Sequence, residues 1–308
     1  MKIAIVGPGA MGLLYGAGLS VKHEVTMIGR NQLNMKEIRE QGIRVEETDG
    51  TANVYHMNAV VDTAELTGGR TACDLVILFT KTGDSYGALD THRNLIDPHT
   101  ILMSLQNGMG HEKTLSKFVQ KENIIIGTTK EGSYRKSPTS VCHSGKGSTA
   151  IGTITGEAKR FQYIADAFTE CGFPCEVASD IRGMIWDKLM INASSSVLTG
   201  IFQVPQGHVA TNTHIWSIAR KLITELCETA TADGYPFDAA EQIERIYKHV
   251  LAAPGGYTSI YADLNAGRKT EVSVINGAVL EAAKRLGIKV PTHEMVVDIV
   301  HGMEEENR

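Results

Sequence analysis

The stretch IAIVGPGAMG, residues 3–12, places four apolar residues directly before three glycines spaced as G-x-G-x-x-G. Such an apolar run predicts a buried strand, and these glycines are typical of a tight turn into a helix. The first glycine bends the chain, the second lets the backbone approach a pyrophosphate, and the third lets the helix pack on the strand. The loop residues expected to bind a dinucleotide are Gly7, Pro8, Gly9, Ala10, Met11 and Gly12.

Further apolar runs follow this strand, separated from one another by helical or turn-rich segments. They are residues 24–28, 75–79, 100–105 and 123–127. Continuous apolar strands between helices indicate a parallel sheet that is covered on both faces. A stretch rich in Ser, Thr and Gly at 128–156 alternates like antiparallel strands, and a helix at 162–170 precedes a last strand at 174–178.

From about residue 180 the strand pattern ends and apolar residues recur with helical spacing. The expected helices are residues 184–198, 214–233, 239–250, 273–286 and 293–303. We therefore predict an α/β protein with two domains. A Rossmann-like dinucleotide-binding domain spans residues 1–179, and an all-helical domain spans residues 180–308.

Composition and charge exclude several classes of protein. The net charge of -5 argues against nucleic acid or an anionic membrane as the main partner. No apolar run approaches the ~20 residues of a membrane span, and no signal segment precedes Ile3, so we expect a cytoplasmic protein. The five cysteines form no C-x-x-C pair and are expected to be free thiols. The apolar helix faces are compatible with a homodimer and equally with core packing.

The residue after the second strand bears on the choice between NADH and NADPH. An NAD site would place Asp or Glu there to bind the ribose 2′-hydroxyl, whereas this sequence has Arg30. A guanidinium can bind a 2′-phosphate through two hydrogen bonds, and Lys81, just after the strand at 75–79, supplies a second cation. The alternative interpretation of Arg30 or Lys81 is a solvated surface cation that does not contact a cofactor. Together the two residues favour NADPH as the cofactor.

A second stretch, WDKLMINASSS at 186–196, predicts one helix with Lys188, Asn192 and Ser196 at steps of four. Residues four apart share a helix face, so this face carries an amine, an amide and a hydroxyl. An amide inside an apolar helix costs free energy unless it is hydrogen-bonded, which favours a functional role or a buried network. The alternative for Lys188 is a surface lysine beside a core tryptophan.

These motifs, together with FTKT at 79–82, QNG at 106–108 and KTEVSVINGAVL at 269–280, resemble the ketopantoate reductase (2-dehydropantoate 2-reductase) family. The resemblance runs nearly end to end and includes GIKVPTHEMV at 287–296. It implies an NADP-dependent oxidoreductase that reduces 2-dehydropantoate to pantoate in pantothenate biosynthesis. It also implies a Rossmann domain, a helical substrate-binding and catalytic domain, and an active site between them.

The resemblance further implies roles for individual residues. Lys188 falls on the catalytic lysine, and Glu271 falls on the acidic residue near the nicotinamide and the substrate. Beyond the glycine loop and Arg30, the implied cofactor contacts are Lys81, Asn107 and Gly132. The implied substrate contacts are Asn107, Asn192, Ser196, Gln206 and Ser259. The chemistry agrees, because hydride addition to a ketone leaves an alkoxide that needs a proton, and a lysine whose pKa is lowered by burial can donate it. For Glu271 the alternative is a solvated residue or cap at a helix start.

The substrate end departs from the family pattern. Ser196 stands where the family often has a second asparagine, and Val272 and Ser273 replace a commoner Ile-Asp pair. Two other functions therefore stay open: a related NAD(P)-dependent 2-hydroxyacid dehydrogenase that reduces another branched or aromatic 2-keto acid, and a non-catalytic nucleotide-binding sensor.

Other residues with reactive side chains are read as structural or surface residues, because the sequence shows no matching partners for them. They are Asp74, Asp84, His143 and His301. Asp263 lies four residues after Ser259 and is expected to share its helix face and to position its neighbours. No H-E-x-x-H motif or Cys/His cluster is present, so no metal is expected.

Overall fold

The computed structural model describes residues 1–66 and 71–306, which form two compact units. The first unit comprises Met1–Gln106 and His111–Ile181, and the second comprises Asn107–Gly110 and Arg182–Arg308. Each unit has its own hydrophobic core. The short segment Asn107–Gly110 thus belongs by its contacts to the second unit, although the chain on both sides of it belongs to the first.

An eight-stranded sheet in the order β12-β11-β8-β7-β6-β1-β2-β5 forms the centre of the first unit. Its strands are β1 (Lys2–Val6), β2 (Glu24–Ile28), β5 (Asn58–Val60), β6 (Leu75–Leu78), β7 (Ile101–Ser104), β8 (Ile124–Thr129), β11 (Thr149–Gly152) and β12 (Cys175–Val177). The six strands from β5 to β8 are all parallel and follow the strand order of dinucleotide-binding folds. Every residue of β6 and β7 is buried, as the continuous apolar runs predicted.

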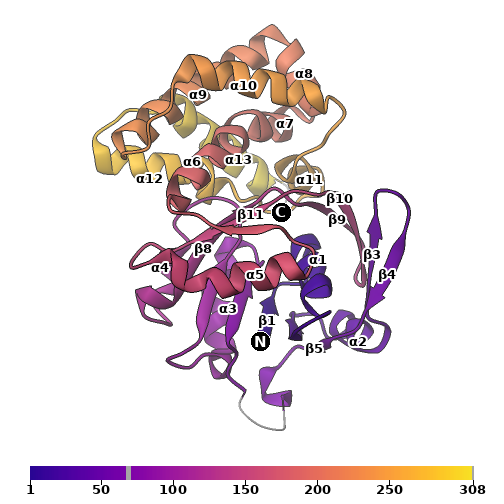
Figure 1. The fold of residues 1–308 in the computed structure, drawn as a ribbon. Helices are drawn as coiled ribbons and strands as arrows, with labels where there is room; N and C mark the ends of the chain where they lie inside the picture. The colour runs from indigo at the N-terminus through magenta and orange to yellow at the C-terminus, as the bar shows by residue number, and fades with distance from the viewer. Residues whose placement is uncertain (67–70, 307–308) are drawn as a thin grey trace. The chain divides into compact units, whose positions relative to one another are not determined.

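A second sheet, in the order β4-β3-β10-β9, adjoins the first helix of this unit. Its strands are β3 (Ile43–Glu47), β4 (Ala52–Tyr55), β9 (Gly132–Ser137) and β10 (Ser140–Gly145). The helices are α1 (Ala10–Leu19), α2 (Gln32–Gln41), α3 (Ser85–Thr91), α4 (Glu112–Leu115) and α5 (Gln162–Glu170). Short 3-10 turns lie at Thr63–Glu65, Thr82–Asp84, Arg93–Leu95, Lys121–Asn123 and Ala158–Phe161. Helix α1 packs against both sheets (Figure 1).

Tyr15 on α1 joins the helix to the sheet. Its ring stacks on Phe79 at 5.3 Å and contacts Phe173 at 4.4 Å between centroids. Its hydroxyl donates to Thr129 Oγ1 at 2.8 Å and lies 2.6 Å from Thr149 Oγ1. Burial raises the pKa of this phenol above its ordinary value. The side chain therefore ties α1 to β8 and β11, which pair antiparallel as expected for the region after residue 127.

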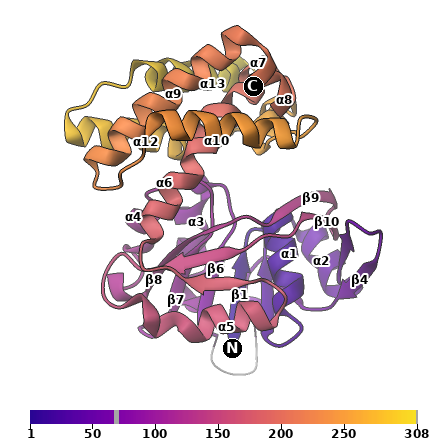
Figure 2. The ribbon, with the colours of Figure 1, turned by 45° about the horizontal axis from the view of Figure 1, so that its top comes forward.

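The described part of the second unit contains helices and no strand. They are α6 (Ile181–Ile191), a π-helical turn (Asn192–Ser196), α7 (Val197–Phe202), α8 (Gln206–Thr211), α9 (Thr213–Ala232), α10 (Ala239–Ala252), α11 (Ser259–Asn265), a 3-10 turn (Val272–Val274), α12 (Asn276–Leu286) and α13 (Pro291–Glu306). Helices α9 and α10 lie side by side (Figure 2). Trp186 is fully buried in the core of this unit. No helix in the described ranges is long and apolar enough to cross a membrane.

Two helices differ from the sequence prediction. Residues 186–196 are not one α-helix, because α6 ends at Ile191 and the π-helical turn follows. Ser194 donates its hydroxyl hydrogen to the Met190 carbonyl, and Ser195 donates to the Ile191 carbonyl at 3.2 Å. Such side-chain bonds compete with the regular helical ladder. The helix expected from residue 273 begins instead at Asn276, after the 3-10 turn.

We expect Tyr15→Phe to lower the free energy of unfolding by about 1 kcal/mol, the usual net contribution of a buried hydrogen bond. The loss stays small because Thr149 and Thr129 still bond each other, with 3.3 Å between their hydroxyl oxygens. Urea unfolding measures the change, and Tyr163→Phe on the exposed side of α5 is the matched control. Equal losses in the two variants would show that the Tyr15 hydroxyl does not join α1 to the sheet.

Candidate active site

The loop between β1 and α1 needs two of its glycines for its own packing. Gly7 has a φ of +110°, and a Cβ there would lie 2.6 Å from the Thr80 backbone nitrogen. A Cβ on Gly12 would lie 2.0 Å from the Gly7 carbonyl oxygen. Because both contacts are with backbone, a side chain at either position would have to displace the turn.

Gly9 is different, because the protein leaves room for a side chain there. The nearest atom to a Cβ on Gly9 is the Phe79 carbonyl oxygen, at 3.9 Å. Gly9 also caps α1 in an extended conformation, with no side-chain bond to the first amides of the helix. Free space next to helical amide donors fits the close approach of a pyrophosphate. The loop therefore fits a dinucleotide, and no close contact with the described residues accounts for a glycine at position 9.

The first residues of β9 lie beside this loop. Gly132 begins the strand, and Ser133 Oγ lies 3.0 Å from the Met11 sulfur. Arg135 donates from Nη1 to the Pro8 carbonyl at 3.3 Å, which brings an exposed guanidinium to the glycine loop. Sequence reasoning missed Arg135, because the only local signal is a cation in an alternating, half-exposed strand.

Arg30 and Lys81 follow β2 and β6, the two neighbours of β1 in the sheet. The carboxyl ends of parallel strands meet at one edge, so both cations lie at the edge that carries the glycine loop. Arg30 is highly exposed and forms an ion pair with Asp84, with Nη2 2.9 Å from Oδ2. Asp84 thus has the partner that the sequence did not reveal. It ends the 3-10 turn Thr82–Asp84 that begins just after Lys81.

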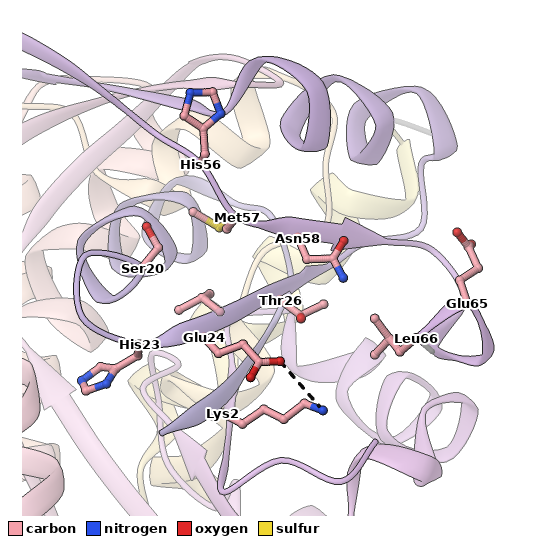
Figure 3. Close-up of a pocket in the computed structure, with 11 residues that line it drawn as sticks. Lys2, Ser20, His23, Glu24, Thr26, His56, Met57, Asn58, Glu65 and Leu66 are labelled. Atoms are coloured by element: carbon pink, nitrogen blue, oxygen red, sulfur yellow. Dashed lines mark ion pairs between the residues drawn. The ribbon is translucent and has the colours of Figure 1, made fainter. Parts of the chain in front are cut away.

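A cavity of about 390 Å³ opens at the opposite edge of this sheet (Figure 3). It lies at the amino ends of β1, β2 and β5, where Lys2, Glu24 and Asn58 line it. Lys2 and Glu24 point toward each other there, with 3.9 Å between Nζ and Oε1 (Figure 3). Ligands of open α/β sheets bind at the carboxyl ends of the strands, so this cavity is not the cofactor site.

In the second unit, the segment Asn107–Gly110 pairs with the residues around Glu271. Asn107 donates from Nδ2 to Glu271 Oε2 at 3.3 Å, and the Met109 amide donates to the Val274 carbonyl at 2.9 Å. Gly108 has a φ of +91°, and a Cβ there would lie 2.3 Å from the Val274 carbonyl oxygen. The glycine of the QNG motif is therefore needed for the close approach that brings Asn107 to Glu271.

Lys188 lies on the last turns of α6 and is only partly exposed. Burial lowers the pKa of its ammonium from 10.5 to about 8, and the negative charge of Glu271 acts in the opposite direction. Removing an ammonium from water favours its neutral form, whereas a nearby carboxylate favours the charged form. The structure thus brings Lys188, Glu271 and Asn107 into one electrostatic group.

Asn192 and Ser196 are the first and last residues of the π-helical turn. Asn192 is partly exposed and Ser196 is buried. The Ser196 carbonyl accepts two side-chain hydrogen bonds, from Thr199 at 2.7 Å and from Thr258 at 3.2 Å. Sequence reasoning missed Thr258, although a threonine before a helix is a usual N-cap, and here it also accepts from the Tyr261 amide.

Gln206 is bonded to the loop before α11, and Ser259 lies at the start of that helix. The Gln206 backbone amide donates to the Gly256 carbonyl at 3.0 Å, and this bond fixes the start of α8 against residues 254–256. Ser259, exposed, begins α11 three residues later. Asp263 is buried and accepts from Arg268 Nε at 3.1 Å, so its carboxylate organises the end of α11.

The remaining residues read as structural or surface have partners distant in sequence. The Lys2 backbone amide donates to Asp74 at 2.7 Å, and His301 Nε2 lies 3.2 Å from Ser273 Oγ. His143 is buried between two carboxylates, 2.6 Å from Glu131 and 3.3 Å from Glu47. These contacts support a structural role. Among residues 1–66 and 71–306, no group of His, Cys, Asp or Glu side chains has the arrangement of a metal site.

Two family descriptions together match most of the chain. The family described as "Ketopantoate reductase PanE/ApbA" matches residues 3–156, and "Ketopantoate reductase PanE/ApbA C terminal" matches residues 180–304. The chain is also similar to a protein named 2-dehydropantoate 2-reductase from Pyrococcus horikoshii. The two are 30% identical over 306 residues, which cover 99% of this chain and 98% of that protein.

Solved structures share the whole fold. One is a ternary structure of D-mandelate dehydrogenase with NADH and anilino(oxo)acetate, with a TM-score of 0.91, 28% identity, and coverage of 100% of this chain and 99% of that one. Another is a 2-dehydropantoate 2-reductase from Geobacter metallireducens GS-15, with a TM-score of 0.90, 27% identity, and coverage of 98% and 99%. The expected α/β class, the oxidoreductase class and a nicotinamide dinucleotide as cofactor are confirmed. The chain belongs to the ketopantoate reductase family.

Proposed function

We propose that the protein reduces 2-dehydropantoate to pantoate with NADPH, and that Lys188 is the general acid. The observation that carries this proposal is the partly buried Lys188 near Glu271. Burial lowers the pKa of the Lys188 ammonium to about 8. A general acid works best when its pKa lies near the working pH. In a chain of this family, that lysine on α6 is the group whose charge state suits proton transfer to a ketone oxygen.

NADPH, when bound, supplies the hydride for this reduction. As the carbonyl carbon accepts a hydride, negative charge develops on its oxygen, and the Lys188 ammonium stabilises that charge and donates a proton to it. Glu271 keeps a larger fraction of Lys188 protonated than burial alone would allow. It also accepts the hydrogen bond from Asn107, and so holds the amide of Asn107 in one orientation.

The cofactor contacts proposed on the first unit are the glycine loop, Arg30, Lys81 and Gly132. The helix α1 amides suit the pyrophosphate, and the cations after β2 and β6 suit a 2′-phosphate. On the second unit, the proposed substrate contacts are Asn107, Asn192, Ser196, Gln206 and Ser259. Their amides and hydroxyls orient a keto acid without adding charge beside Lys188.

A second candidate substrate is a branched or aromatic 2-keto acid without the 4-hydroxyl of ketopantoate. The observation that favours it is the likeness to D-mandelate dehydrogenase, together with a short serine at position 196. NADPH oxidation followed with ketopantoate, 2-ketoisovalerate and phenylglyoxylate decides between the two. A preference for ketopantoate supports the proposed function. A preference for either of the other two keto acids would instead identify the protein as a related 2-hydroxyacid dehydrogenase. No turnover with any of the three keto acids would favour the alternative of a non-catalytic nucleotide-binding sensor.

We expect Lys188→Ala to lower kcat by about 10²–10⁴-fold, the usual contribution of a positioned general acid. NADPH binding, measured by the fluorescence of the reduced nicotinamide, should be retained. In the unchanged protein the acid is protonated below its pKa, so kcat for reduction should fall as the pH rises through about 8. Lys248→Ala, at an exposed ion pair on α10, is the control. An unchanged kcat in Lys188→Ala would remove this lysine from the mechanism.

Arg30→Ala is expected to weaken NADPH binding much more than NADH binding, because only NADPH carries the 2′-phosphate. Asp84→Asn should have the opposite effect and tighten NADPH binding, since the Asp84 carboxylate competes with the phosphate for the Arg30 guanidinium. The dissociation constants of both nucleotides measure the two changes. Asp90→Asn, which breaks a surface ion pair with Arg93, is the control for Asp84→Asn. Equal weakening of both nucleotides by Arg30→Ala would place the 2′-phosphate elsewhere.

Gly12→Ala is expected to weaken the binding of both nucleotides by at least about tenfold. Its Cβ would lie 2.0 Å from the Gly7 carbonyl oxygen, so the loop that receives the pyrophosphate must shift. Gly87→Ala on α3 is the control, because a Cβ there has nothing within 4 Å. Circular dichroism establishes that both variants fold. Unchanged nucleotide affinity in a folded Gly12→Ala protein would contradict the proposed pyrophosphate site.

A further inference from the structure

The π-helical turn Asn192–Ser196 changes how the side chains of α6 are arranged. In an α-helix each residue advances by about 100°, so eight residues from Lys188 to Ser196 would end about 80° away from the starting direction. A π-helical turn holds more residues than an α-helical turn, because its hydrogen bonds join residues five apart. Four residues of an α-helix rotate by slightly more than one full turn, whereas four residues of a π-helix rotate by slightly less than one full turn. The wide turn therefore returns Ser196 toward the direction of Lys188.

Such a turn needs support from outside the helix, because it disturbs the regular hydrogen-bond ladder. Its carbonyls receive that support from side chains. The Ser196 carbonyl accepts from Thr199 and Thr258, and the Ala193 carbonyl accepts from Asn276 Nδ2 at 2.8 Å. Asn276 is fully buried at the start of α12, so this bond joins two elements that are distant in sequence.

The orientation of the Asn276 amide is set by His293. Nε2 of His293 lies 3.0 Å from the Leu222 carbonyl, so this nitrogen carries the hydrogen and Nδ1 is an acceptor. Burial lowers the pKa of His293 to about 4, which keeps the imidazole neutral at neutral pH. Asn276 Nδ2 then donates one hydrogen to His293 Nδ1, at 3.2 Å, and the other to Ala193. A flipped amide would turn its oxygen toward two acceptors.

Within the described part of the chain, the oxygen of the Asn276 side-chain amide lacks a partner, so this side chain is not arranged for stability alone. Asn276 Oδ1 is buried and has no hydrogen-bond partner among the described residues. A buried polar atom without a partner costs free energy. The donors of this side chain are satisfied and its acceptor is not, which is the arrangement expected of a residue that serves to hold the Ala193 carbonyl.

The bond between Asn276 and Ala193 links the two segments that carry the proposed catalytic pair. Lys188 lies five residues before Ala193, and Glu271 lies five residues before Asn276. We propose that Asn276, oriented by His293, is a positioning residue: it holds the π-helical turn against the start of α12 and so fixes Lys188, Ser196 and Glu271 relative to one another. This inference rests on the proposed function of Lys188 and Glu271, and extends it to residues that touch neither substrate nor cofactor.

Asn276→Ala tests this inference. Without the amide, the α6 and α12 segments can separate, and water gains access to Lys188. Burial is the larger influence on this ammonium and Glu271 the smaller, so its pKa should rise from about 8 toward 10.5. Competitive acetylation of Lys188 at several pH values, read by mass spectrometry, measures that pKa without turnover. We also expect kcat to fall by about 10–100-fold, because small misplacements of reacting groups are costly.

A matched pair of threonine variants separates positioning from loss of stability. Thr199→Val removes a donor to the Ser196 carbonyl within the π-helical turn, and Thr229→Val removes a donor to the Glu225 carbonyl within the regular helix α9. Both threonines are fully buried, and both changes nearly conserve shape. We expect faster amide exchange in residues 190–198 and a raised Lys188 pKa in Thr199→Val, and neither effect in Thr229→Val.

The outcomes distinguish the two proposals. Absence of turnover in the unchanged protein would overturn the proposed function, while the acetylation and exchange measurements would still test the positioning role. An unchanged or lower pKa of Lys188 in folded Asn276→Ala would overturn the positioning role. If Asn276→Ala does not fold, Thr199→Val decides in its place. Equal effects of Thr199→Val and Thr229→Val on Lys188 would also overturn it.

Discussion

The burial of one lysine ammonium is the constraint on which the second unit depends. Removing a charged amine from water is unfavourable unless nearby groups compensate, and a single carboxylate compensates only in part. Glu271 opposes the effect of burial on Lys188, yet the pKa still falls to about 8. The outcome is an amine that is mostly protonated at neutral pH and reaches the balance between its charged and neutral forms near pH 8. Such a balance holds only while the packing around Lys188 and its separation from Glu271 stay fixed.

The polar side chains of this unit meet that requirement by bonding to each other and to the backbone. Asn107 is bonded to Glu271, Asn276 to His293, and both Thr199 and Thr258 to the Ser196 carbonyl. In surroundings of low dielectric, each such bond is stronger than in water, and each unsatisfied group is more costly. A hydrogen-bonded set of this kind therefore resists rearrangement. Gly108 contributes in another way, since only a residue without a side chain lets the Asn107 segment approach Val274.

Local sequence patterns predicted the parts of the fold whose cause is local. The strands of the parallel sheet follow from continuous apolar runs, because both faces of such a strand are buried. Strands β3, β4 and β5 escaped prediction because they carry exposed residues, such as Val54 in β4, and so do not form continuous apolar runs. The positions of Arg30 and Lys81 at strand ends were predictable for the same local reason. The ion pair between Arg30 and Asp84 was not, because it depends on the order of strands in the sheet.

Contacts between distant residues limit what can be predicted of the site. The bond between Asn107 and Glu271 spans 164 residues, and that between Asn276 and Ala193 spans 83. No periodicity in either segment indicates the partner. The family resemblance placed Asn107 and Glu271 near one substrate, but it offered nothing for Asn276 and His293. Their role becomes apparent only when the carbonyls of the π-helical turn are followed to their donors.

The π-helical turn also shows why likeness of fold does not determine the substrate. The chain resembles D-mandelate dehydrogenase and 2-dehydropantoate 2-reductases over nearly its whole length, with TM-scores of 0.91 and 0.90 for the two structures compared. A fold shared to that degree fixes where α6 runs, but not the direction of each side chain after Ile191. That direction depends on how many residues the next turn contains. A serine reaches less far than an asparagine, so the position of its Cβ has more influence on whether its hydroxyl reaches a ligand. In the proposed function, any selectivity that Ser196 confers is therefore a joint property of the residue and of the turn that carries it.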